Sequence, residues 1–382
     1  MRVMHFVPYF PPDRVGGVGE FVAALHGGLL QRGHDSEVVT TGVKSEGPVH
    51  RIARSRLGWF LSTLCWIRAA SQCDVVHCQA GEALLVMLGL RLLPRRRARI
   101  LVTFHSSSAG MMRANAPYRI EGRRFGPGLG RRLTGAVMGS LHRATDALAL
   151  RLADGLNTIA RSTARELMGP RLGASSQVIY NPLPPASASS FDAEQGVESV
   201  DLFYVGLATH RKRVALLPFV LARVRRARPG TRLRIAGFEL DEAPALRALF
   251  EAQGCLDAVE CIGRRRSDEL PGYYRAARIV LIPSAYEGLP YVLIEALQQG
   301  TPVVATRVSG HPEVIEDGVG GLLVPVDDPG AMAAACLRLL QDPDLAAALG
   351  DAGRRAVAER FDLDRQVDAY LHYYRALSKE AP

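Results

Sequence analysis

Two glutamates and the backbone amides of one loop have the chemistry to bind sugar hydroxyls and an anion together. The loop SAYEGLP at 284–290 follows an apolar strand and carries Glu287, and the helix after it carries Glu295, eight positions later. With Pro290 near the first helical turn, the backbone amides of 288–291 are expected to form an anion site. A carboxylate at Glu295 can accept hydrogen bonds from two ribose hydroxyls. Either glutamate alone would also fit a capped helix with an exposed side chain.

A cluster of basic residues precedes this loop in the sequence. In YVGLATHRKRVALL, the residues His210, Arg211, Lys212 and Arg213 follow a strand and lead into an apolar helix. Such cations can neutralise a diphosphate, lysine as a point charge and arginine as a bidentate fork. Only 3 of the 47 basic residues are lysine, so the lysine at 212 indicates a preference for an ammonium group. A solvated basic turn is the alternative.

A histidine and a glycine-rich loop in the first half also lie where ligands bind. His105 ends the strand RILVTF and is followed by three serines; it could hydrogen-bond a phosphate or a sugar hydroxyl, or act as a general acid or base. His77, at another strand end, has the same potential with less support. Gly16 and Gly17 precede a helix, where amides can converge on an anion. A turn without a ligand is equally compatible, and Val22 replaces the third glycine of a dinucleotide fingerprint, which argues against NAD.

Short apolar runs alternate with amphipathic segments, and this rhythm predicts parallel sheets with helices on both faces. Two α/β doubly wound sheets in tandem follow, with ligands expected at the carboxyl ends of strands and in a cleft between the domains. The segment 181–199, rich in proline, serine and alanine, is expected to connect them. The predicted strands are 2–7, 36–41, 74–78, 99–104, 154–159 and 176–180, then 200–205, 231–236, 258–261, 278–282, 302–306 and 321–325.

Length and composition agree with a folded two-domain protein. The chain has 382 residues, of which 48% are hydrophobic and 22% charged, so a disordered chain and a polytopic membrane protein are both excluded. The N-terminus does not read as a signal peptide, and the longest apolar run, at 83–90, is too short to span a bilayer. The six cysteines form no close C-x-x-C pair, so no zinc site or disulfide framework is expected.

The charge of the chain is unevenly divided. Residues 1–190 hold 24 Lys and Arg against 11 Asp and Glu, a net of +13, and residues 191–382 hold 23 against 27, a net of −4. The segment 95–132 has ten arginines against Glu121 alone. It is predicted to dock on an anionic membrane, and a solvated loop is the equal alternative. No recognised module supports nucleic-acid binding.

The loop and the segments after it resemble the donor-site signature of glycosyltransferase family 4, the retaining group 1 enzymes with the GT-B fold. The signature runs from Glu287 to Glu295 and continues in GTPVV at 300–304 and GHPEVI at 310–315. The resemblance covers nearly the whole chain. Four earlier motifs occur in the same order as in the family: GGVGEF at 16–21, VTFH at 102–105, VIYNPL at 178–183 and the loop at 204–213.

The resemblance implies a role for each motif residue. Glu295 would bind the donor ribose, Glu287 would contact the transferred sugar, and Lys212 would pair with the diphosphate. His105 and the Gly16–Gly17 loop would lie beside the reacting sugar and phosphate, so His105 and Glu287 are the expected catalytic residues. The other expected donor-binding residues are Gly206, Arg211, Gly288, Leu289 and Pro290.

Two positions depart from the family pattern. Leu207 follows Gly206 where the family usually has arginine, so Arg211 or Arg213 is expected to supply that charge. Asn181 is followed by proline where the family has glycine, which leaves the role of Asn181 open.

The resemblance also implies a domain plan. It is a GT-B pair of Rossmann-like domains facing a central cleft, with the acceptor in the basic half and the donor in the acidic half. The expected parts are an N-terminal acceptor domain at 1–185, a connection at 186–199, a donor domain at 200–360 and a C-terminal helix at 361–382 that crosses back to the first domain.

The implied function is retaining transfer of a sugar from a nucleotide-diphosphate sugar to an acceptor hydroxyl. Polysaccharide, lipopolysaccharide or other glycoconjugate synthesis is the expected setting, in the cytoplasm or at the inner face of the cell membrane, with a carbohydrate or lipid-linked acceptor. Cations and amides can stabilise the leaving diphosphate, so no metal or cofactor is expected, and Asp342, Asp344, Asp362 and Asp364 are interpreted as helix caps. The alternatives are a sugar-nucleotide epimerase or hydrolase, a natural-product glycosyltransferase with a small-molecule acceptor, and a catalytically silent nucleotide-sugar binder.

Overall fold

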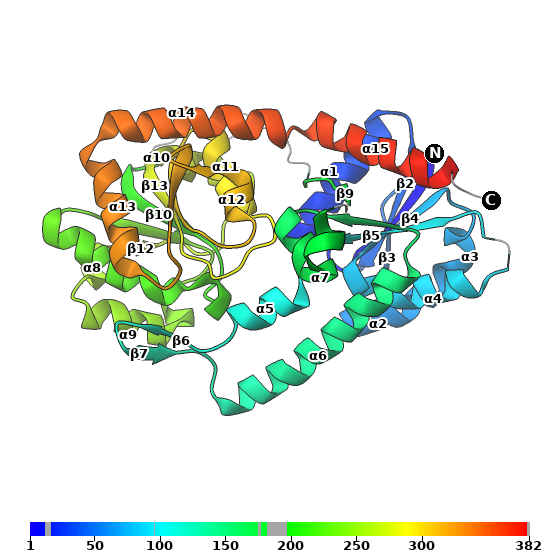
Figure 1. Ribbon diagram of the computed structural model, residues 1–382, viewed down its shortest axis with the longest axis horizontal. Helices are drawn as coiled ribbons and strands as arrows, with labels where there is room; N and C mark the ends of the chain where they lie inside the picture. Colours follow the sequence, from blue (N-terminus) through cyan, green and yellow to red (C-terminus); the bar gives the residue numbers. More distant parts are fainter. Residues whose placement is uncertain (12–16, 95, 175–176, 182–196, 380–382) are drawn as a thin grey trace. The chain divides into compact units, whose positions relative to one another are not determined.

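A computed structural model describes residues 1–11, 17–94, 96–174, 177–181 and 197–379 of the chain (Figure 1). These residues form two compact units. Unit 1 comprises 1–109, 135–185 and 361–382, and unit 2 comprises 110–134 and 186–360. In the described part of the chain, the helices are either too short or too polar to cross a membrane.

Unit 1 is built on a seven-stranded parallel sheet with the order β3-β2-β1-β4-β5-β8-β9. The chain reverses its direction of strand addition between β1 and β4, which makes that point the switch of a doubly wound sheet. The strands are β1 Arg2–Phe6, β2 Asp35–Thr41, β3 Val49–Ala53, β4 Val75–Gln79, β5 Arg99–Phe104, β8 Gly155–Thr158 and β9 Gln177–Val178. The helices are α1 Gly17–Gln31, α2 Arg56–Ser62, α3 Ile67–Ala70, α4 Leu84–Leu92, α5 Ser108–Ala114, α6 Leu129–Leu152, α7 Arg161–Ala174 and α15 Leu363–Lys379, of which α5 and α6 extend into unit 2.

Unit 2 repeats this plan with the order β12-β11-β10-β13-β14-β16-β15, again parallel throughout. Its switch point lies between β10 and β13. The strands are β10 Val200–Val205, β11 Leu233–Ala236, β12 Val259–Cys261, β13 Ala277–Ile282, β14 Val303–Thr306, β15 Glu316–Asp317 and β16 Gly320–Val324. The helices are α8 Leu217–Ala227, α9 Pro244–Ala252, α10 Leu270–Ala276, α11 Tyr291–Gln298, α12 His311–Val314, α13 Pro329–Gln341 and α14 Pro343–Arg360.

The predicted fold class of two doubly wound parallel α/β sheets is confirmed. One edge strand of unit 1 was not predicted. The sequence of β3 at 49–53, VHRIA, is interrupted by His50 and Arg51 and is half-buried along its whole length, so it lacks the apolar run that marks the central strands.

Residues 110–134 differ from the sequence-based domain plan, which assigned them to the N-terminal domain. They pack with unit 2. Two short antiparallel strands, β6 Tyr118–Ile120 and β7 Arg123–Phe125, form a hairpin there. Tyr118 and Ile120 are buried in the core of unit 2, and the ring of Phe125 meets that of Phe219 on α8 edge to face.

The last helix, α15, packs against unit 1, beside α1 (Figure 1). Contact is close because Gly28 of α1 has no side chain: a Cβ there would lie 2.5 Å from a methyl of Val367. Tyr370 accepts a hydrogen bond from the Asn157 amide at 2.7 Å. Asp342 and Asp362 accept hydrogen bonds from backbone amides at the starts of α14 and α15, which confirms their interpretation as caps.

Candidate functional site

The loops that carry the predicted donor-binding residues meet at the switch point of unit 2. β10 and β13 are paired and parallel, so their carboxyl ends lie side by side at one edge of the sheet. The loop after β10 brings Gly206, Arg211 and Lys212, and the loop after β13 brings Glu287. The two loops are joined directly, because the amide of Ala285 donates to the carbonyl of Arg211 at 2.8 Å.

Glu287 lies between the two cations of this site. Lys212 Nζ is 2.7 Å from its Oε1, and Arg211 Nη1 is 2.7 Å from its Oε2. Ser284 Oγ also donates to Oε1 at 2.7 Å. Burial by itself would raise the pKa of Glu287, but the charges of Lys212 and Arg211 outweigh that effect and lower this pKa to about 2. The carboxylate is therefore ionised at neutral pH, and it orients both cations.

A second turn, after β14, packs tightly against the Glu287 loop. The amide of Gly310 donates to the Glu287 carbonyl at 3.3 Å. A Cβ at 310 would lie 1.8 Å from the carbonyl oxygen of Gly288, so only glycine fits there. Leu289 is buried, and Pro290 stands at the N-cap of α11. The predicted loop residues therefore occur together, at the start of a helix.

Glu295 is half-buried on α11, and its Oε2 accepts a hydrogen bond from Tyr274 at 2.8 Å. Burial raises the pKa of Tyr274 well above its usual value, so this hydroxyl keeps its proton and acts as the donor. Tyr274 and Ser284 orient the two glutamates, and sequence reasoning missed both. Ser284 could have been found from its position three residues before Glu287, whereas Tyr274 gives no local signal.

Of the two arginines expected to replace the missing family charge, Arg211 is the one that pairs with Glu287 beside Lys212. Leu207 occupies the family position and is 54% exposed. Arg213 is buried and contacts Asp327 and the carbonyl of Ala114, which argues against the expectation that it serves the diphosphate instead. Arg211, in contrast, already points at Glu287 beside Lys212.

His105 stands at the end of β5 in unit 1, as predicted. Its Nε2 lies 2.8 Å from Gln79 Oε1, so in this arrangement Nε2 carries the proton and donates, and Nδ1 is left as an acceptor. The ring of Phe21 packs against it, with centroids 4.9 Å apart. Burial lowers the pKa of His105 to about 3, which favours a hydrogen-bonding role over acid and base catalysis near neutral pH.

His77 has a structural role. Its ring is fully buried and is hydrogen-bonded on both nitrogens, to Tyr374 of α15 and to Thr103 of β5, each at 2.7 Å. It therefore links the sheet of unit 1 to the last helix.

The glycine loop of unit 1 is only partly described. Gly16 lies outside the described residues, and Gly17 is the exposed first residue of α1. Gly19 is required for packing, since a Cβ there would lie 2.8 Å from the carbonyl oxygen of Tyr9.

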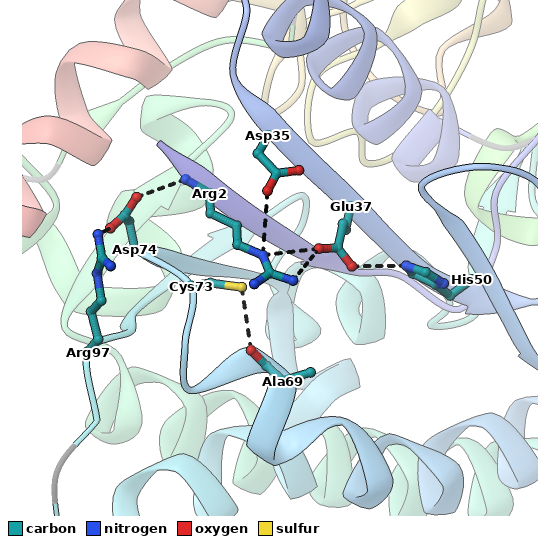
Figure 2. Close-up of polar contacts among 8 residues, drawn as sticks. All are labelled: Arg2, Asp35, Glu37, His50, Ala69, Cys73, Asp74 and Arg97. Carbon is teal, nitrogen blue, oxygen red and sulfur yellow. Dashed lines mark hydrogen bonds and ion pairs between the residues drawn. The ribbon is translucent and has the colours of Figure 1, made fainter.

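The arginines of 95–132 lie on several different elements. Arg96, Arg97 and Arg99 lie at the amino-terminal end of β5 in unit 1, and His105 follows the carboxyl end of the same strand. Figure 2 shows Arg97 paired with Asp74, which also accepts from the amide of Arg2. Arg96 and Arg99 pair with Asp154, and Arg95 lies outside the described residues. These arginines are ion-paired at the start of β5. Further along the chain, Arg119, Arg123 and Arg124 are exposed on the β6–β7 hairpin of unit 2, and Arg113 and Arg132 are exposed on α5 and α6.

The described residues gather no three His, Cys, Asp or Glu side chains into a set that could hold a metal ion.

Comparison with protein families identifies both halves of the chain. The family model described as "Glycosyltransferase Family 4" matches residues 15–187 of the sequence. The family model described as "Glycosyl transferases group 1" matches residues 199–342. Among curated relatives, a D-inositol 3-phosphate glycosyltransferase of Saccharomonospora viridis is 34% identical over 201 residues. That alignment spans 50% of this chain and 46% of the relative, so the chain matches about half the length of that relative. A glycogen synthase of Mycobacterium tuberculosis is 27% identical over 99% of this chain and 95% of its own.

Solved structures share the fold over the whole chain. Sucrose-phosphate synthase from Thermosynechococcus elongatus superposes with a TM-score of 0.78 at 21% identity, covering 100% of both chains. The Anabaena protein HepE in complex with UDP superposes with a TM-score of 0.73 at 18% identity, covering 98% of this chain and 100% of that one. At this level of identity the likeness establishes the architecture.

Proposed function

Because the chain belongs to the group 1 glycosyltransferases of family 4 and has their GT-B fold, we propose that it moves a sugar, with retention, from a nucleotide-diphosphate sugar to an acceptor hydroxyl. One observation carries this proposal: Lys212 and Arg211 converge on the buried Glu287 at the switch point of unit 2. Unit 2 would hold the donor, and the basic half of the chain would hold the acceptor.

The geometry supports electrostatic catalysis. When the bond between the sugar and the diphosphate breaks, negative charge develops on the leaving diphosphate, and preorganised cations stabilise it. Lys212 and Arg211 are held in place by a carboxylate before any ligand arrives, so little reorganisation is needed. Glu295, oriented by Tyr274, would accept the ribose hydroxyls, and Glu287 would face the transferred sugar.

Neither a metal nor a cofactor forms part of this proposal, because the two cations and the amides of the Glu287 loop suffice for the diphosphate. The UDP bound to HepE makes UDP-sugars the first donors to test. A polysaccharide, lipopolysaccharide or other glycoconjugate is the proposed acceptor, and the inositol phosphate and glycogen enzymes among the relatives make small polyols and glucans the first acceptors to test.

Membrane contact is proposed through the hairpin of unit 2. Arg119 and Arg124 face each other across β6 and β7, and both are exposed, as is Arg123. The turn residue Glu121 does not neutralise them, because it pairs with Arg223 of α8. Like charges directly opposite each other destabilise a hairpin, and an anionic lipid surface would relieve that repulsion. The site of action would then be the inner face of the cell membrane.

The proposal is tested by a thermal-shift screen against nucleoside diphosphates and nucleotide sugars. The donor identified there is then incubated with and without acceptors, and the release of nucleoside diphosphate is measured. Release that depends on an acceptor supports a transferase. Release in its absence indicates a hydrolase, conversion of the sugar without release indicates an epimerase, and binding without turnover indicates a silent binder.

A further inference from the structure

Arg213 has a conformation that most side chains avoid. Its backbone is left-handed, with φ 52° and ψ 34°, and for a residue other than glycine this costs roughly 1 kcal/mol. Its side chain is almost completely buried, 4% exposed. A buried charge in a strained backbone persists only where its surroundings hold it strongly.

Two segments that are distant in sequence hold this guanidinium. Nε donates to Asp327 Oδ1 at 2.8 Å, in the loop after β16. Nη1 donates to the carbonyl of Ala114 at 2.8 Å, and the guanidinium carbon lies 3.6 Å from the centre of the Tyr118 ring. Ala114 and Tyr118 belong to the segment 110–134, which the sequence places in the N-terminal half and the structure packs with unit 2.

The same guanidinium also fixes the turn that presents the diphosphate cations. Nη1 donates to the carbonyl of His210 at 2.6 Å, so Arg213 closes the turn His210–Lys212 from within. From the other side, the amide of Ala285 holds the carbonyl of Arg211. Arg211 and Lys212 are therefore placed by two anchors, of which one is Arg213 and the segment it binds.

We propose that Arg213 is a positioning residue for nucleoside-diphosphate binding, through which the docked segment 110–134 holds Arg211 and Lys212 in their binding geometry. This inference rests on the proposed donor site. It gives the segment a function in unit 2 that its place in the sequence does not suggest. Arg213 itself touches no substrate in this scheme, because its side chain is buried and its Nε and Nη1 donate to Asp327, Ala114 and His210.

The test is calorimetric binding of UDP, ADP and GDP to the full chain and to Arg213→Met and Arg213→Lys. We expect the methionine variant to bind the preferred nucleotide about tenfold more weakly, since small displacements of positioned groups have large effects. Lysine keeps the charge but cannot reach three acceptors in different directions, so we expect it to restore only part of the affinity. Tyr118→Leu provides a second variant in case the arginine substitutions do not fold, and it should weaken binding in the same direction.

The matched control is Arg223→Met. Arg223 also holds the segment, through Glu121, but it lies on α8 and not in the donor turn. We expect this variant to lose only the link to Glu121, while Ala114 and Tyr118 keep their contacts with Arg213, so nucleotide affinity should not change. Equal affinity for Arg213→Met and the unmutated protein, with only a lowered melting temperature, would overturn the proposal, as would equal losses in both variants. Failure of the unmutated protein to bind any of the three nucleotides would instead refute the donor site.

Discussion

Glu287 sets the charge balance of the donor loop, because both cations of the loop end on its two carboxylate oxygens. One carboxylate against two cations leaves the cluster with a net positive charge before any ligand binds. A diphosphate would then compete with Glu287 for the same donors. The carboxylate is therefore suited to placing the cations and facing the sugar, and it opposes the binding of the diphosphate.

Substitution Glu287→Gln should separate these two effects. The isosteric amide removes the negative charge, so nucleoside-diphosphate affinity should stay the same or rise, while turnover should fall about a hundredfold because the group facing the sugar is lost. Calorimetry and steady-state rates measure the two quantities independently. Transfer at the unmutated rate would remove Glu287 from the reaction centre.

Lys212 and Glu295 are expected to bind different parts of the donor, and inorganic pyrophosphate distinguishes them. Lys212→Ala should weaken both pyrophosphate and nucleoside diphosphate about tenfold or more, because a charge-assisted hydrogen bond is lost. Glu295→Ala should weaken the nucleoside diphosphate alone, since pyrophosphate has no ribose. Competition binding on both variants gives the comparison. If the two variants lose affinity for pyrophosphate equally, the ribose assignment of Glu295 fails.

At the scale of elements, the donor loops were predictable and the hairpin was not. Strands β10 and β13 are each apolar except for one charged residue, Asp201 and Arg278. Parallel topology then brings Gly206, Lys212 and Glu287 to the carboxyl ends of these strands without further information. The ring of Tyr118 stacks on that of Phe125, and the ring of Phe125 meets that of Phe219, about a hundred residues further along the chain. No local period in a hairpin that spans only 118–125 encodes such a partner, so the segment could only be assigned to its neighbours in sequence.

The same limit applies to single side chains. His105 and Glu295 were found because each ends or follows a recognisable element. The burial of Arg213, its link to Asp327 and the pairing of Arg97 with Asp74 depend on which strands are adjacent. The basic stretch 95–132 therefore includes both ion-paired arginines at the start of β5 and exposed arginines on the β6–β7 hairpin.

The exposed hairpin predicts binding to anionic membranes that depends on two arginines. Replacing Arg119 and Arg124 by glutamine should reduce partitioning to phosphatidylserine vesicles roughly thirtyfold, since each basic side chain near such a surface contributes about 1 kcal/mol. Sedimentation with vesicles at low and high salt measures this partitioning. The control is Arg97→Gln, which removes an arginine of the same stretch that is paired with Asp74 and should leave partitioning unchanged. Equal binding by all three proteins would favour the alternative of a solvated loop.

At the scale of the whole molecule, the two units differ in how they respond to acid. Unit 1 contains a group of packed histidines: the rings of His5 and His77 are 5.3 Å apart, and those of His5 and His26 are 6.5 Å apart. Burial lowers the pKa of His77 to about 3. Burial also lowers the pKa of His5 well below its usual value, and the neighbouring rings of His77 and His26 lower the pKa of His5 further. In unit 2, burial also lowers the pKa of His311, but the charge of Glu287 opposes the shift.

The sign of the effect follows from linkage. Below the unfolded pKa of 6.5, the unfolded chain takes up protons that the buried rings refuse, so the stability of unit 1 falls as the pH drops toward the folded value of about 3. At pH 5 each fully buried ring should reduce stability by about 2 kcal/mol. The depressed pKa of Glu287 acts in a lower window, below about pH 4.5, where its stabilising contribution is lost as the pH falls toward 2.

Unit 1 should therefore unfold before unit 2 between pH 6.5 and 5. The only two tryptophans, Trp59 and Trp66, both belong to unit 1, so their fluorescence in urea titrations at pH 7 and pH 5 reports that unit alone. Hydrogen exchange of β10 and β13, corrected for the intrinsic pH dependence, reports unit 2. His5→Leu removes a ring that has no hydrogen-bond partner among the described residues, and it should reduce the pH effect on the stability of unit 1 by about 2 kcal/mol. Equal shifts in both units, or a His5→Leu variant as acid-sensitive as the unmutated protein, would show that the buried histidines do not control this response.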